Sequence, residues 1–205
     1  MQIVVTGMHR SGTSAVAGML HGAGVFMGEK LIGPDRSNPK GHFEDVEVKK
    51  INDAILAESG GAWDDPPDRY VVSDQTKEWI KEFISQRCAD HDVWGMKDPR
   101  LMLTWEFWVP FLNEPKMIVC DRQIEFIARS LKARNGFHLW KGEGLTSAYW
   151  HSGQELFTSG KKLFRCHYHD LVEHPESVAF RMRTFLDHLV TPDASFIDKS
   201  LRHHR

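Results

Sequence analysis

The segment Gly7–Ser14, with the sequence GMHRSGTS, contains the residues of this chain best suited to chemistry. Its two glycines let the backbone turn tightly and approach a ligand, and free N–H groups at the start of a following helix bind an anion. Their spacing is that of a nucleotide-binding phosphate loop, but Thr13 stands where a kinase has its lysine, and the cation is Arg10 instead. We predict an anion site whose members are Gly7, His9, Arg10, Ser11, Gly12, Thr13 and Ser14. The alternative is an ordinary glycine-rich turn.

The elements that must position this loop follow from the hydrophobic pattern. Strands are predicted at 2–6, 93–96, 117–120 and 163–168. Helices are predicted from Thr13 to the glycines at 22 and 24, from 44 to 60, around 80–84, and at 124–133 and 175–189, with a loop over 28–43. Alternating strands and helices predict an α/β fold, a three-layer αβα arrangement around a central parallel sheet. The phosphate loop then joins a buried strand to a helix, as such loops require.

Composition restricts the class of protein. A length of 205 residues favours one domain, residues 1–205. The net charge of −2 gives no support to sequence-independent nucleic-acid binding, so no nucleic-acid partner is expected. The cysteines, Cys88, Cys120 and Cys166, lie in apolar stretches and are expected to be reduced core residues. The chain shows no signal peptide and no apolar run of about 20 residues, so we expect a cytoplasmic protein without a membrane span.

The arginine-containing form RSGTS of the loop resembles the 5′-phosphosulfate loop of the sulfotransferases that use 3′-phosphoadenosine-5′-phosphosulfate (PAPS). It is closest to the bacterial and tyrosylprotein-modifying branches of that family. The resemblance implies a P-loop α/β fold, transfer of a sulfuryl group from PAPS, adenosine 3′,5′-bisphosphate as the product, and no required metal.

The same resemblance implies a second anion site. Family members bind the 3′-phosphate of the donor with an arginine at a strand end and a serine eight positions later, and Arg122 and Ser130 match that pattern. Ile124 replaces a proline that is frequent in the family. Tyr168 matches a family tyrosine that packs against adenine, and Lys199 or Arg202 matches a closing segment near the 3′-phosphate. Alternatively, these are a surface arginine, a helix serine and a core tyrosine.

The resemblance also implies catalytic roles. Arg10 and Lys97 are the candidates for stabilising the bridging oxygen as it becomes an anion. Glu44 is the candidate base, with His42 as the second candidate, and Lys40 is a candidate contact for the acceptor or the sulfuryl group. The alternatives are that Lys97 forms a structural ion pair with Asp98 or another acid, and that Glu44 caps a helix.

The acceptor is expected to be a hydroxyl of a saccharide, a lipid or a small molecule. The stretch 44–68 is acidic and favours a neutral or cationic acceptor, whereas the stretch 116–141 is basic and indicates an anionic ligand. Five tryptophans are candidates for lining the acceptor site, although most are expected in the core: Trp94, Trp105, Trp108, Trp140 and Trp150. The resemblance leaves room for a homodimer that completes the acceptor pocket. Two other functions remain open, a P-loop kinase of small molecules and a non-catalytic nucleotide-binding module.

Overall fold

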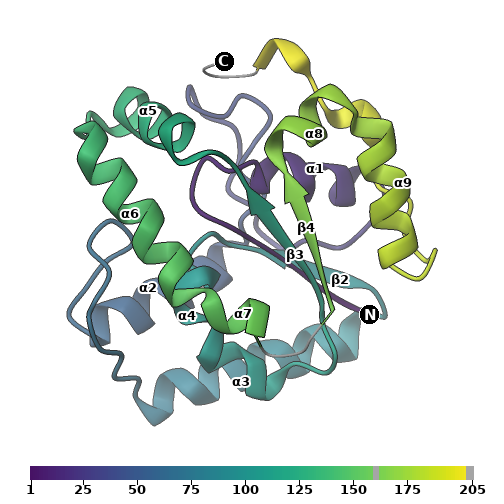
Figure 1. Ribbon diagram of the computed structural model, residues 1–205. Coiled ribbons are helices and arrows are strands. Elements are labelled where there is room, and N and C mark those ends of the chain that lie inside the picture. The colour runs from purple at the N-terminus through teal and green to yellow at the C-terminus, as the bar shows by residue number, and fades with distance from the viewer. Residues whose placement is uncertain (159–161, 202–205) are drawn as a thin grey trace.

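A parallel four-stranded sheet lies at the centre of the described part of the chain, residues 1–158 and 162–201 of a computed structural model (Figure 1). The strands are β1 (Gln2–Thr6), β2 (Trp94–Lys97), β3 (Lys116–Asp121) and β4 (Leu163–His167), in the order β2-β1-β3-β4. Every neighbouring pair is parallel. All of β1 and the middle of β3 are buried, which explains why their sequences are continuous apolar runs without alternation.

Helices cover both faces of this sheet, which confirms the predicted α/β class (Figure 1). One core packs the sheet against α2, α3, α4, α5 and α6, and the other packs it against α1, α8 and α9. The helices are α1 (Thr13–Gly22), α2 (Val46–Glu58), α3 (Asp74–Asp90), α4 (Leu101–Trp108), α5 (Ile124–Asn135), α6 (Leu139–Ser152), α7 (Gln154–Thr158), α8 (Tyr168–Glu173) and α9 (Pro175–Phe185). Short 3₁₀ turns are η1 (Val109–Phe111), η2 (Ala194–Phe196) and η3 (Lys199–Leu201).

Several elements differ from the sequence-based prediction. Helix α4 was not predicted, because nearly all its residues are apolar and buried, and a helix without a polar face has no amphipathic period. Helix α6 was also not predicted, since it contains Gly142 and Gly144. The last strand ends at His167 and Tyr168 begins α8, so the tyrosine lies at a helix start rather than within the strand.

Two further expectations concern the cysteines and the membrane. All three cysteines are free, and Cys120 and Cys166 are buried, but Cys88 is exposed on α3, so its assignment to the core was wrong. Within the described residues, no helix combines the length and the apolar character needed to cross a bilayer.

Candidate functional site

The predicted phosphate loop lies between the end of β1 and the start of α1. Gly7 and Gly12 adopt φ angles of 139° and 104°, which favour glycine. A Cβ atom on Gly7 would lie 2.3 Å from the Cys120 carbonyl oxygen, so the loop passes directly against β3. A Cβ atom on Gly12 would lie 2.8 Å from Cδ2 of Tyr168. The loop therefore needs glycine at both positions, and it brings the tyrosine ring close to the start of α1.

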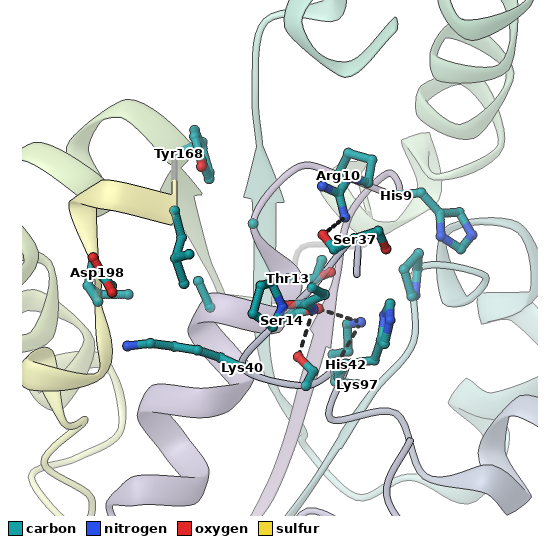
Figure 2. A pocket seen from close by; sticks show the side chains of 18 of the residues that line it. His9, Arg10, Thr13, Ser14, Ser37, Lys40, His42, Lys97, Tyr168 and Asp198 are labelled. Atoms are coloured by element: carbon teal, nitrogen blue, oxygen red, sulfur yellow. Dashed lines mark hydrogen bonds between the residues drawn. The ribbon is translucent and has the colours of Figure 1, made fainter. Parts of the chain in front are cut away.

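A cleft of about 920 Å³, part of it open to solvent, lies over this loop, and we call it the phosphate cleft (Figure 2). Most of the predicted site residues line it, although they come from five separate parts of the chain: His9, Arg10, Gly12, Thr13, Ser14, Lys40, His42, Glu44, Lys97, Arg122 and Tyr168. Of the residues predicted for the donor site and described in the structure, Gly7, Ser11, Ser130 and Lys199 do not line it. The fold thus collects in one cleft residues whose proximity the sequence could not show.

Lys97 and Glu44, the candidate cation and the candidate base, form a buried ion pair. Lys97 Nζ lies 2.6 Å from Glu44 Oε1, and it also donates to Ser14 Oγ at 3.2 Å and to the His42 carbonyl oxygen at 3.1 Å. The side chain of Lys97 is 1% exposed and that of Glu44 is 9% exposed. Burial opposes ionisation of Glu44, but the charge and the hydrogen bond of Lys97 outweigh it and hold the pKa of this carboxyl below its ordinary value. Glu44 is therefore an ionised carboxylate at neutral pH.

The neighbouring carboxyls take the structural roles that the sequence left open. Asp45, not Glu44, caps α2, and its side chain accepts from the Glu47 backbone N–H. Asp45 also pairs with Arg87 at 2.6 Å. Asp98 does not pair with the lysine beside it, because Arg100 contacts both of its carboxylate oxygens. Asp45 thus takes the capping role considered for Glu44, whereas Lys97 does form the ion pair with another acid that was the alternative to a catalytic role, and its partner is Glu44.

Arg10 and Arg122 form a cationic cluster with Ser130 and Tyr168. Arg10 Nε donates to Ser130 Oγ at 2.8 Å, and the Arg10 carbonyl oxygen accepts from Arg122 at 3.1 Å. The Arg122 guanidinium lies 4.2 Å from the centre of the Tyr168 ring. Burial and the neighbouring Arg122 lower the pKa of Arg10, as expected where two cations lie close together. The predicted residues of the second anion site are therefore linked through Arg10.

The orientation of Arg10 differs from that of Lys97. Its guanidinium also donates to the Ser37 carbonyl oxygen at 3.2 Å, and Figure 2 shows Arg10 beside Ser37 while Lys97 lies beside His42 and Ser14. Arg10 thus lies on the Ser130 side of the cleft, and Lys97 alone of the two candidate cations contacts Glu44.

The remaining predicted residues lie in the loop 28–43 and near the end of the described chain. His42 Nε2 lies 3.0 Å from Asp35 Oδ2, and Lys40 Nζ donates to the Phe196 carbonyl oxygen. Lys199 donates to the carbonyl oxygen of Glu173 at 3.1 Å. Arg202 lies outside the described residues.

His9 is a buried member of the loop, with its ring 4.6 Å from the ring of Trp63. Burial, together with the charges of Arg100, Arg134, Lys97 and Arg10, lowers its pKa well below the ordinary value of 6.5. The imidazole is therefore neutral at neutral pH.

Sequence reasoning missed Trp63, in the loop 61–73, and Asn135, at the end of α5. Trp63, Arg134 and Asn135 line a second cavity beside the phosphate cleft. Of the tryptophans proposed for the acceptor site, Trp94, Trp105 and Trp108 are buried in the core, and Trp140 is 71% exposed on α6. The sequence offered Arg134, with Arg129 and Lys132, as a residue to strengthen the second anion site or as part of a solvated helix face.

Within the described ranges, no group of three or more His, Cys, Asp or Glu side chains is placed to hold a metal ion.

Comparison with family models and with curated proteins gave no match. Comparison with solved structures gave matches at low sequence identity. The sulfotransferase STF9 from Mycobacterium avium matches with a TM-score of 0.61 and 15% identity, over 91% of this chain and 63% of that one. The sulfotransferase domain of the Synechococcus PCC 7002 olefin synthase matches with a TM-score of 0.57 and 16% identity, over 98% of this chain and 76% of that one.

The chain has the fold of bacterial sulfotransferases. It spans less than two thirds of the length of STF9. A sugar kinase from Janibacter sp. HTCC2649 also matches, with a TM-score of 0.54 and 13% identity over 99% of this chain and 98% of that one. Because one fold serves different chemistries, the function must be argued from the residues of the cleft.

Proposed function

We propose that this protein is a sulfotransferase that moves a sulfuryl group from PAPS to a hydroxyl of a saccharide, a lipid or a small molecule. The observation that carries the proposal is the buried Glu44–Lys97 pair, which lines the phosphate cleft and contacts Ser14 at the start of α1. It places a group that takes a proton beside a cation that stabilises developing negative charge. The sulfotransferase fold supports the same conclusion.

The residues of the cleft are chemically suited to the donor. The backbone N–H groups of the loop and the hydroxyls of Thr13 and Ser14 would hold the 5′-phosphosulfate. Arg122 and Ser130 would hold the 3′-phosphate, and Tyr168 would pack against adenine. The closeness of Arg10 and Arg122 supports an anion site here, because a bound phosphate would offset the repulsion between these two cations.

When bound, PAPS supplies an activated sulfuryl group. In the proposed reaction the acceptor oxygen forms a bond to sulfur, the bond from sulfur to the bridging phosphate oxygen breaks, and adenosine 3′,5′-bisphosphate leaves with the electron pair. The proton of the acceptor hydroxyl passes to Glu44. Lys97 would stabilise the bridging oxygen, and Arg10 would bind the donor phosphates.

The first test is a thermal-shift titration with adenosine 3′,5′-bisphosphate, with ADP, and with ATP in the presence and absence of magnesium. A ligand at 100 times its Kd stabilises the fold by about 2.7 kcal/mol, which is readily measured. We expect stabilisation by the 3′,5′-bisphosphate without magnesium. A preference for ATP with magnesium would refute the proposal and favour a kinase, to which the sugar kinase match would then be relevant.

The second test separates catalysis from binding. Glu44→Gln keeps the shape of the side chain and removes its proton-accepting charge. We expect it to abolish transfer of labelled sulfuryl groups from PAPS while adenosine 3′,5′-bisphosphate still binds. A wild-type protein that binds this nucleotide but transfers nothing to a broad set of hydroxyl compounds would indicate a nucleotide-binding module.

A further inference from the structure

The second cavity is a shallow depression that is widely open to solvent, and it lies beside the phosphate cleft and shares several lining residues with it. Glu44, His42 and Arg134 line both. A molecule in the second cavity therefore reaches the proposed base, whereas the loop residues Gly12, Thr13 and Ser14 line only the phosphate cleft. If the protein is the proposed sulfotransferase, the second cavity is the place for the acceptor.

The acidic side chains of the second cavity already have partners. Asp35 accepts from Ser37 and from the Asn38 backbone N–H and contacts His42, and these contacts hold its pKa below the ordinary value although burial opposes them. Glu44 pairs with Lys97. The charge of Glu44 is therefore offset by a buried cation, whereas Asp35 remains an ionised, half-exposed carboxylate held by hydrogen bonds.

The cations of the second cavity are less completely neutralised. Arg100 pairs with Asp98 and Asp53. In contrast, within the described part of the chain no carboxylate forms an ion pair with Arg134 or Arg36, which also line the cavity.

Among the described residues, the direct contacts of Arg134 are with neutral groups, although the charges of Glu44 and Asp35 are near enough to favour its ionised form. Its Nε donates to the Asn135 side-chain oxygen at 2.7 Å, and its guanidinium lies 5.4 Å from the centre of the Trp63 ring. Burial and the nearby charge of Arg10 lower the pKa of Arg134 to about 10. A half-buried guanidinium in this environment is stabilised by an anion, which it can bind with two parallel hydrogen bonds.

The acidic stretch 44–68, which favoured a neutral or cationic acceptor, contributes little to this surface. Asp45 pairs with Arg87, and Glu58 accepts from the residues that begin α3. Asp64 pairs with Lys141. Of the acids in the stretch, Glu44 is the one that lines the second cavity. The acids of the stretch other than Glu44 therefore do not line the second cavity.

We propose that the acceptor is a small hydroxylated anion, whose carboxylate or similar anionic group binds Arg134 and Arg36 while its hydroxyl lies at Glu44. This proposal rests on the proposed function and adds a substrate class to it. Loss of either arginine should raise KM for an anionic acceptor. Arg36 lines only the second cavity, so its loss should also leave donor binding unchanged, whereas Arg134 lines both clefts and its variant is compared at saturating donor.

The test uses acceptors in matched pairs in which an amide replaces the carboxylate and the hydroxyls are unchanged: methyl glucuronide against methyl glucuronamide, and 4-hydroxybenzoate against 4-hydroxybenzamide. Transfer of labelled sulfuryl groups from PAPS gives kcat and KM, and calorimetry gives the affinity for adenosine 3′,5′-bisphosphate. We expect the wild type to prefer a carboxylate member by about tenfold or more in kcat/KM. Arg134→Gln and Arg36→Gln should each lose that preference through KM. Lys132→Gln removes a charge from an exposed position on the same helix as Arg134 and is the matched control.

The outcomes separate the two proposals. Equal use of charged and neutral members, a preference that survives both arginine variants, or no transfer to any member by a protein that binds adenosine 3′,5′-bisphosphate would overturn the anionic acceptor. Failure of the wild type to bind adenosine 3′,5′-bisphosphate would instead overturn the proposed function. Normal nucleotide binding by each variant shows that it is folded.

Discussion

Replacing Lys97 with methionine would leave one buried charge without its partner. The ammonium of Lys97 contacts Glu44 at 2.6 Å, Ser14 at 3.2 Å and the carbonyl oxygen of His42 at 3.1 Å. Methionine retains an unbranched apolar stem of similar length but makes none of these contacts. Because Glu44 is buried, solvent cannot replace the lost cation.

The size of the effect follows from this burial. Breaking a buried ion pair on one side costs about 3–5 kcal/mol. Each kcal/mol shifts the Tm of a domain of about this size by about 2–4 °C, so we expect the Tm of Lys97→Met to fall by roughly 6–20 °C at neutral pH. Transfer of sulfuryl groups should fall by about 10²–10³-fold or more, since the cation assigned to the bridging oxygen is gone.

The dependence of stability on pH should also change sign. In the wild type the pKa of Glu44 lies below its ordinary value of 4.5, so the pair stabilises the fold above that value and the stabilisation is lost as the pH falls through the lowered pKa. In Lys97→Met burial is no longer outweighed by the lysine and raises the pKa of Glu44. The variant should therefore lose stability as the pH rises through that raised pKa, and acidification from pH 7 to 5 should stabilise it relative to the wild type.

The assay is thermal unfolding from pH 5 to 8 of the wild type, Lys97→Met and the double variant Glu44→Gln, Lys97→Met. The double variant should recover stability at neutral pH, because no charge is left buried, but it should not recover activity. Lys132→Met, at an exposed position of α5, should change stability by less than about 0.5 kcal/mol. A Lys97→Met protein within about 1 kcal/mol of the wild type, with a parallel pH profile, would refute the reasoning.

Three further predictions concern the loop and the donor site. Gly7→Ala should lower the free energy of unfolding by more than the about 1–3 kcal/mol expected for a strained positive φ, because its Cβ would lie 2.3 Å from a backbone carbonyl oxygen of β3. Urea unfolding measures this loss, and Gly24→Ala, which has a positive φ but open space around its Cβ, is the control that isolates the clash. Tyr168→Leu removes the ring that Arg122 contacts and should weaken binding of adenosine 3′,5′-bisphosphate about tenfold, while Tyr168→Phe keeps the ring and should bind normally. Equal affinities of the wild type and both variants, measured by calorimetry, would contradict this prediction. Burial lowers the pKa of His9, so the wild-type fold should lose stability as the pH falls below 6.5, the pKa of histidine in the unfolded chain. His9→Asn should reduce this loss, and thermal unfolding at pH 5–7 in which the Tm of variant and wild type decrease in parallel would exclude this role of His9.

The sequence was sufficient to predict the elements that depend on local patterns. The α/β class and the loop Gly7–Ser14 follow from apolar runs, glycines and short-range spacing, which the local backbone must satisfy in any fold. Helix α4 escaped prediction because its residues are apolar on every side and give no period. Whether such a segment is a strand or a helix is decided by what packs around it.

Tertiary structure alone decided which side chains meet. Glu44 and Asp45 are adjacent carboxylates at a helix start, and both fit the pattern of a helix cap and of a proposed base. Their roles differ because their partners differ: Glu44 contacts Lys97, 53 residues later in the chain, and Asp45 contacts Arg87, 42 residues later. Burial then determines the charge of each group, since a buried carboxylate is stable only beside its cation. Position along the chain fixes neither the partner nor the burial, so the chemistry of the cleft depends on contacts between residues that are distant in sequence.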